Sequence, residues 1–149
     1  MVSDLNDRKY MKYSNSRFMH HTISSQLRYL EFFVDSLNQY AGGFFKEMSD
    51  LAVTLTFFIN QNHRTAGVGI LVLSNAAVKK IGFEAYAASI RYLFEVCGIR
   101  KVTGGTLSAN VKMVKIFERL GFALEGVCKK HEIVGSQEVD TLLFGKFNV

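Results

Sequence analysis

The sequence predicts a single α/β domain in which a mixed central sheet is flanked by helices. Residues 66–107 show a strand–helix–strand pattern, which favours a parallel strand pair joined by a right-handed crossover. A run rich in Val, Thr, Leu and Phe at residues 51–60 and a second apolar run at residues 66–73 enclose a short polar turn and predict an antiparallel hairpin. The chain has 149 residues, of which 48% are hydrophobic and 21% charged. That is enough for one core but not two, so residues 1–149 are expected to form one domain.

The first forty residues are predicted to hold an irregular segment and one amphipathic helix. Residues 1–21 are polar, and a short helix followed by a loop is expected there. From Thr22 to Leu37, apolar residues recur every three or four positions, which predicts a helix that Gly42–Gly43 would close. Residues 44–48 are compatible with a short strand. The hairpin of residues 51–60 and 66–73 follows, with its turn at residues 61–64.

The second half of the chain has clearer boundaries. A helix is predicted over residues 82–97, ended by Gly98, and a strand over residues 100–107. Ser108 or Asn110 can cap the next helix, and Gly121 suits the left-handed residue that ends it. Residues 122–134 and 139–147 are predicted to form a final strand pair around Gly135–Ser136.

Composition and charge limit the classes of function that the chain can have. No apolar run approaches the roughly twenty residues that span a bilayer, and the N-terminus lacks an apolar signal region, so we expect a cytoplasmic protein without membrane partners. Cys97 and Cys128 are expected to be free thiols, and no metal site is expected. The net charge of +5 attracts anions in general. We do not expect a nucleic-acid partner, because neither a basic stripe nor a recognisable binding module is found.

Residues 108–126 carry a family resemblance. Asn110 lies seven residues before Phe117, and Glu118, Gly121–Phe122 and Glu125–Gly126 follow. With these motifs the segment resembles the second half of the GCN5-related N-acetyltransferase (GNAT) fold, and more narrowly the branch of the ribosomal-protein N-terminal acetyltransferases (RimJ/RimL type). The likeness extends from about residue 7 onward, although the first strand usual in the family has no clear counterpart. It implies transfer of an acetyl group from acetyl-CoA to a primary amine by direct attack in a ternary complex.

The resemblance also implies a place for acetyl-CoA. Residues 74–81 join a strand to a helix, and the free backbone N–H groups at a helix start attract phosphate. In the family this junction is the pyrophosphate loop, and its key positions here are Ala77, Lys80 and Gly82. Gly82 fits, whereas Lys80 replaces a glycine that permits close backbone approach. The residues implied to contact the co-substrate are Leu71, Val72, Leu73, Lys79, Lys80, Ile81, Gly82, Phe83, Asn110 and Phe117.

The resemblance also implies which residues would carry the chemistry. Many family members have Tyr at position 117, whose hydroxyl can protonate the departing thiolate, and Phe117 cannot donate a proton. Glu132 is the candidate base for the attacking amine, with His131 in reserve and Asp140 a weaker choice. An exposed strand glutamate without a catalytic role is an equally good interpretation of Glu132.

The acceptor is left open by the sequence. By the same resemblance, Arg17 and His21 would line the acceptor groove. A protein N-terminus, a nucleotide-linked amino sugar and a small polyamine or aminoglycoside all remain candidates, and the positive charge favours the nucleotide-linked sugar. A homodimer is also considered. The alternatives to an enzyme are a non-catalytic acyl-CoA-binding or interaction module on a degenerate GNAT fold, and a small basic nucleic-acid binder.

Overall fold

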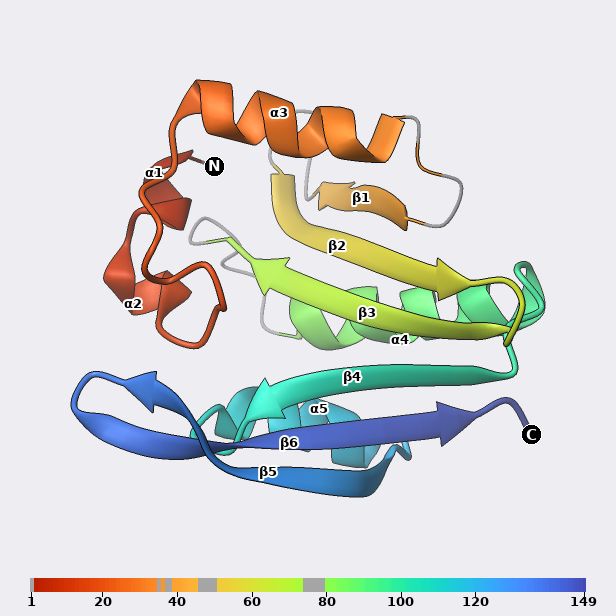
Figure 1. Ribbon diagram of the computed structural model, residues 1–149. Helices are drawn as coiled ribbons and strands as arrows, with labels where there is room; N and C mark the ends of the chain where they lie inside the picture. Colours follow the sequence, from red (N-terminus) through yellow and green to blue (C-terminus); the bar gives the residue numbers. More distant parts are fainter. Residues whose placement is uncertain (1, 35, 37–38, 46–50, 74–79) are drawn as a thin grey trace.

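The computed structural model describes residues 2–34, 36, 39–45, 51–73 and 80–149, and it shows a mixed α/β architecture (Figure 1). Six strands form one sheet in the order β1-β2-β3-β4-β6-β5. Only β3 and β4 pair in parallel, and the other neighbours are antiparallel. Along the chain the elements are α1 (Val2–Leu5), α2 (Arg8–Met11), α3 (Ile23–Val34), β1 (Gln39–Phe45), β2 (Leu51–Asn60), β3 (Thr65–Val72), α4 (Ile81–Glu95), β4 (Lys101–Leu107), α5 (Val111–Arg119), β5 (Ala123–Val134) and β6 (Gln137–Phe147).

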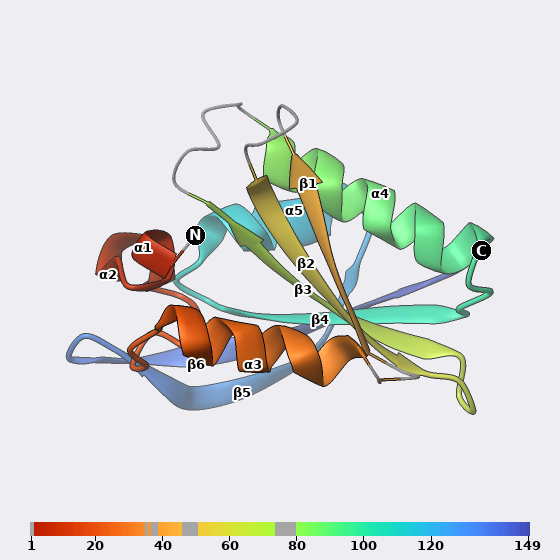
Figure 2. The same ribbon diagram turned by 90° about the horizontal axis from the view of Figure 1, so that it is seen from above.

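The sheet lies between two helical layers. Helices α4 and α5 cover one face, and α3 lies on the other (Figure 2). Helix α4 is the crossover between β3 and β4, as the strand–helix–strand pattern predicted. Within the described residues, no helix is long and apolar enough to cross a membrane.

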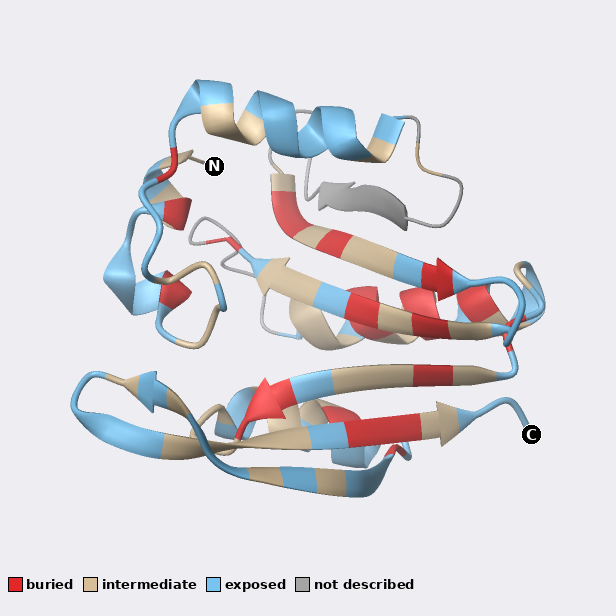
Figure 3. Ribbon diagram, in the orientation of Figure 1, coloured by how far each residue is buried: buried red, intermediate tan, exposed pale blue. Residues whose placement is uncertain are grey.

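An aromatic cluster forms the core between the sheet and its two covering helices. Phe117 is fully buried and stacks on Phe144 with ring centroids 4.6 Å apart. Phe122 lies 5.1 Å from Phe117, and Tyr86 meets Phe117 edge-on at 5.7 Å. The Tyr86 hydroxyl donates to the backbone oxygen of Val68 at 3.4 Å, and burial raises the pKa of this hydroxyl. Buried positions recur along β2, β3, β4 and β6 (Figure 3), so the core joins the middle of the sheet to α4 and α5.

The first predicted helix is shorter than its periodicity indicated. Helix α3 spans Ile23–Val34, while Gly42 and Gly43, expected to close it, lie inside β1. Of the residues predicted beyond Val34, Leu37 and residues 46–48 lie outside the described part. Strand β1 pairs with β2 along Gln39–Phe45, and this non-local pairing overrides the local helical pattern.

Helix α3 also exposes most of its apolar positions. Ile23, Leu27, Leu30 and Val34 are 44–78% exposed, although their spacing is that of a core-facing stripe. The helix instead turns Tyr29 toward β2, where its hydroxyl lies 3.4 Å from Thr56 Oγ1.

The segment before α3 forms short helices and turns. Helices α1 and α2 and the following turns match the expected short helix and loop, and no strand occurs within residues 2–20. Asn6 fixes this segment to the start of α3, because its side chain accepts from the backbone N–H of His21 and donates to its carbonyl, both at 2.8 Å.

Candidate active site

The parallel pairing between β3 and β4 ends shortly after it begins, and the two strands then diverge. Their parallel register covers only Thr65–Gly67 against Lys101–Thr103, although β3 continues to Val72 and β4 to Leu107. Both strands keep their outer partners over these lengths, β2 for β3 and β6 for β4. The backbone beyond Gly67 and Thr103 therefore faces a gap in the sheet.

A cavity of about 480 Å³ lies at this gap. Strands β3 and β4 contribute six residues to its lining, and four of them are glycines: Gly67, Gly69, Gly104 and Gly105. Without side chains at these positions, the two backbones can be approached closely. Such a gap can hold an extended chain that pairs with the strand edge, and the predicted contact residues Leu71 and Val72 lie farther along β3. Leu73 follows the strand and is buried.

The start of α4 has no side-chain cap among the described residues, and it lies beyond the end of β3. Lys80 is the N-cap residue, and its side chain makes no capping hydrogen bond. The backbone N–H groups of the first turn, at residues 81–83, therefore have no cap from Lys80. A Cβ on Gly82 would come within 3.0 Å of Val72 Cγ2, so glycine lets the helix start approach the strand end. These features suit a phosphate group. Lys79 and Ala77 lie outside the described residues.

Lys80 adopts a backbone conformation that glycine favours. Its φ is 82° and its ψ is −5°, in the left-handed region that favours glycine. We expect Lys80→Gly to raise the free energy of unfolding by about 0.5–1 kcal/mol, because relief of the left-handed penalty exceeds the added entropy of the unfolded chain. Chemical denaturation measures this change in the free energy of unfolding, provided that the m-value is unchanged.

A matched variant, Lys80→Ala, removes the ammonium group but keeps the Cβ. Loss of acetyl-CoA affinity in both variants would assign the contact to the ammonium group. A Lys80→Gly variant no more stable than Lys80→Ala would contradict the strain argument.

Two predicted co-substrate residues have structural roles in α5. Asn110 is its N-cap, and the side-chain oxygen accepts from the backbone N–H of Met113 at 3.4 Å, as the sequence predicted. Phe117 lies at the centre of the aromatic core and is fully buried. Gly121, with φ at 72°, ends the helical segment as expected.

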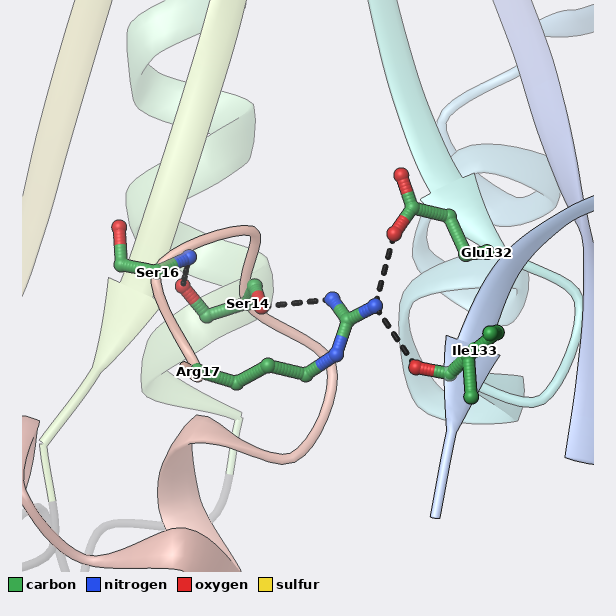
Figure 4. Close-up of polar contacts among 5 residues, drawn as sticks. All are labelled: Ser14, Ser16, Arg17, Glu132 and Ile133. Atoms are coloured by element: carbon green, nitrogen blue, oxygen red, sulfur yellow. Dashed lines mark hydrogen bonds and ion pairs between the residues drawn. The ribbon is translucent and has the colours of Figure 1, made fainter. Parts of the chain in front are cut away.

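Arg17 and Glu132, chosen separately from the sequence, form an ion pair. Arg17 Nη2 lies 2.7 Å from Glu132 Oε2, and it also donates to the carbonyl of Ile133 at 2.9 Å (Figure 4). Arg17 Nη1 donates to the carbonyl of Ser14 at 2.9 Å. The side chain of Arg17 is only 7% exposed, and that of Glu132 is 30% exposed. The N-terminal loop and the β5–β6 turn thus meet at the end of the sheet where β3 and β4 finish (Figure 1).

His131 lies in an irregular part of β5. Cys128 pairs with Thr141 and Glu132 pairs with Val139, so three residues of β5 oppose one of β6. Lys130 has a φ of 49° within this bulge, which interrupts the alternation of side chains found in a regular strand. His131 itself is exposed.

Asp140 holds the bulge in place. Its carboxylate accepts from the backbone N–H of Lys130 at 2.8 Å and from Lys129 Nζ at 3.0 Å. These two bonds, the backbone one first, hold the pKa of Asp140 below its ordinary value of 3.8. Both oxygens of Asp140 thus accept a hydrogen bond among the described residues, which weakens the case for Asp140 as a base.

This lowered pKa predicts a pH dependence of stability. Asp140 stabilises the fold above its unfolded-state pKa near 3.8, and the contribution is lost as pH falls through the lower folded-state value. Asp140→Asn should therefore flatten the decline in the free energy of unfolding below about pH 4. Urea denaturation at several acidic pH values measures the difference, and parallel curves for both proteins would contradict it.

His21 is buried just before α3, and its ring contacts a side chain of that helix. It is 7% exposed, and its Nδ1 lies 2.9 Å from Gln26 Nε2. It does not line the cavity at the gap between β3 and β4. Cys97 and Cys128 are free thiols, as predicted.

Sequence reasoning missed the glycine lining of the gap. Glycine pairs inside predicted strands, as in Gly67-Val68-Gly69 and Gly104-Gly105, indicate sites where another backbone or a ligand approaches closely. That signal was present in the sequence and could have located the gap.

Comparisons with known proteins agree with this geometry. The family model of the acetyltransferase (GNAT) domain matches residues 2–123. Among solved structures, spermidine N-acetyltransferase from Vibrio cholerae in complex with CoA and spermine has a TM-score of 0.86 at 17% identity, covering 98% of this chain and 86% of its own. An acetyltransferase of the GNAT family from Bacillus anthracis has a TM-score of 0.80 at 16% identity, with coverage of 99% and 86%. No curated protein sequence matches. The parted strands, the glycine-lined gap and the matching domain model together place the chain in the GNAT acetyltransferase family, and it is an acyltransferase.

Proposed function

We propose that the protein transfers the acetyl group of acetyl-CoA to a primary amine by direct attack in a ternary complex. The gap between β3 and β4 carries this proposal. It opens beyond Gly67 and Thr103, is lined by glycines, and has the uncapped start of α4 beyond the end of β3. An extended acyl arm with phosphates at one end matches this arrangement, since strand edges and helix N-termini supply the two kinds of backbone donor.

Glu132 is proposed as the proton acceptor. The co-substrate supplies an acetyl thioester, the amine nitrogen forms the new C–N bond, and the C–S bond breaks. Glu132 takes the amine proton, and Arg17 orients its carboxylate through the 2.7 Å contact to Oε2. In the part of the chain that the structure describes, the polar contacts found for Glu132 all involve Oε2, which leaves Oε1 for the amine.

The thiolate is proposed to leave without an acid from residue 117. Phe117 has no proton to give and is fully buried. The Tyr86 hydroxyl beside it already donates to Val68, and burial raises its pKa, so it keeps its proton. A thiolate is a stable enough leaving group for water to protonate it afterwards.

Calorimetric titration with acetyl-CoA tests the function. Binding, followed by acetylation of at least one member of a primary amine panel, supports the enzyme. Binding without turnover supports the alternative of a non-catalytic acyl-CoA-binding module. Absence of binding would overturn both. Salt-dependent retention on DNA or RNA, with no acetyl-CoA binding, would support the nucleic-acid alternative.

Three finer assignments belong to this proposal. Membership of the ribosomal-protein branch rests on the motifs of residues 108–126, and a cytoplasmic location rests on composition. A homodimer is supported by the exposed apolar positions Ile23, Leu27, Leu30 and Val34 on α3. Light scattering that gives the monomer mass at micromolar concentration would contradict the dimer.

A further inference from the structure

A second and larger cavity lies beside the proposed base. Its volume is about 850 Å³, within the range of small-molecule sites. Three segments line it: residues 5–12 with gaps, residues 17–20, and the β5–β6 turn at residues 134–137. The cavity therefore lies between the N-terminal segment and the final hairpin, on the side where Arg17 meets Glu132.

The ionisable side chains that line this cavity are all basic. They are Arg8, Lys12, Arg17 and His20, and among the described residues no Asp or Glu lines it. Asn6, Ser136 and Gln137 add neutral polar groups. Several cations around a concave surface attract anions and repel other cations. Spermidine and spermine are polycations at neutral pH, and this lining opposes them.

Arg17 supplies a donor that has no partner in the described part of the chain. Its two terminal nitrogens bind Ser14, Glu132 and Ile133, whereas its buried Nε has no hydrogen-bond partner among the described residues. In Figure 4 the dashed hydrogen bonds of the guanidinium group all reach Nη1 or Nη2. A buried unpaired donor is unfavourable, and an acceptor oxygen from a ligand would satisfy it.

The same guanidinium group links the cavity to the proposed base. Arg17 lines the cavity and binds Glu132 Oε2, so a ligand anion beside the Arg17 guanidinium would lie one side chain away from the carboxylate. We propose that this cavity binds an anionic group, a carboxylate or a phosphate, on the amine acceptor, and so presents the amine to Glu132. The proposal rests on the proposed function for its amine, but the anion site can be tested separately.

The anion site is tested by nuclear magnetic resonance without any acetyl transfer. Inorganic phosphate and acetate are titrated separately into the full-length protein while the Nε–H resonance of Arg17 is followed. We expect this resonance to shift on saturation, and the double variant Arg8→Gln, Lys12→Gln to weaken the apparent affinity about tenfold, as expected for loss of charge-assisted bonds. Both residues are exposed, so the fold should survive. The control Lys115→Gln, an exposed lysine on α5, should behave as wild type. An unshifted Arg17 resonance with both anions would overturn the proposal.

Pairs of acceptors with and without an anionic group then show whether the cavity recognises a phosphate or a carboxylate. Glucosamine 6-phosphate is compared with glucosamine, β-alanine with β-alaninamide, and spermidine is tested alongside, by kcat/KM with acetyl-CoA. We expect a preference of about tenfold or more for the anionic member of one pair, which identifies the recognised group as phosphate or carboxylate. The Arg8→Gln, Lys12→Gln variant should lose this preference while its KM for acetyl-CoA stays unchanged. Equal use of both members of each pair, or a preference for spermidine, would overturn it. Failure to acetylate any amine, with the Arg17 shift intact, would count against the proposed function alone.

Discussion

Replacing Glu132 with Gln is expected to lower kcat by roughly 10²- to 10⁴-fold while leaving the affinity for acetyl-CoA within about twofold of wild type. Gln keeps the shape of Glu and can still accept a hydrogen bond from Arg17, whose Nη2 lies 2.7 Å from Oε2. It cannot take the proton of the amine. The acidic limb of the pH–rate profile should also move or disappear, because that limb would report deprotonation of the base. Steady-state kinetics across pH and calorimetry with acetyl-CoA provide the two measurements.

Glu138→Gln is the matched control, because it lies on the same hairpin. The side chain of Glu138 is 59% exposed and its carboxylate lies 3.1 Å from Lys130 Nζ, so it loses an ion pair of the same type without touching Arg17. Its kcat should stay near wild type. Equal activity of Glu132→Gln and wild type would exclude Glu132 as the base and direct attention to His131.

The fold from β2 onward could be predicted because its signals are local and agree with one another. In α5, the cap at Asn110, the apolar spacing and the left-handed Gly121 all indicate one helix of the same extent. Strand β2 was predicted with its observed bounds, and the turn before β3 was placed correctly. The parallel crossover followed from the order of elements alone.

The part before β2 could not be predicted in the same way, because tertiary contacts decide it. The pattern that suggested a helix as far as Gly42–Gly43 gives way to a strand that pairs with β2. The apolar spacing on α3 correctly indicated a helix but not its orientation, since Ile23 and Val34 are 70% and 78% exposed. A periodic pattern shows that one face is apolar, and it does not show what that face meets.

The candidate site illustrates the same limit. Arg17 and Glu132 are 115 positions apart in sequence, and no local pattern could have paired them. Residue type and family resemblance singled out each one, while their contact depends on how the N-terminal loop reaches the final hairpin. Lys80 shows the converse: its residue type departs from the expected glycine, yet its backbone takes the conformation that glycine favours.

Gly104→Ala is expected to destabilise the protein by about 2 kcal/mol, within the usual range for overpacking a core. A Cβ at this position would lie 2.6 Å from Phe117 Cζ and 2.8 Å from the Tyr86 oxygen. Both rings are fully buried, so neither can move into solvent. At about 2–4 °C per kcal/mol for a chain of this size, the melting temperature should fall by about 4–8 °C. Differential scanning calorimetry measures the shift.

The neighbouring glycine separates this clash from a general effect of replacing glycine in a strand. A Cβ on Gly105 has its closest contacts at 3.7 Å, an ordinary van der Waals distance, so Gly105→Ala should change the melting temperature little. In the double variant Gly104→Ala, Phe117→Leu, the smaller side chain should recover part of the loss caused by Gly104→Ala, which gives a favourable coupling energy between the two sites. Equal melting temperatures for Gly104→Ala and Gly105→Ala would contradict the argument. A confirmed coupling would show that the ring of Phe117 requires glycine at position 104, and so link the aromatic core directly to the glycine lining of the gap between β3 and β4.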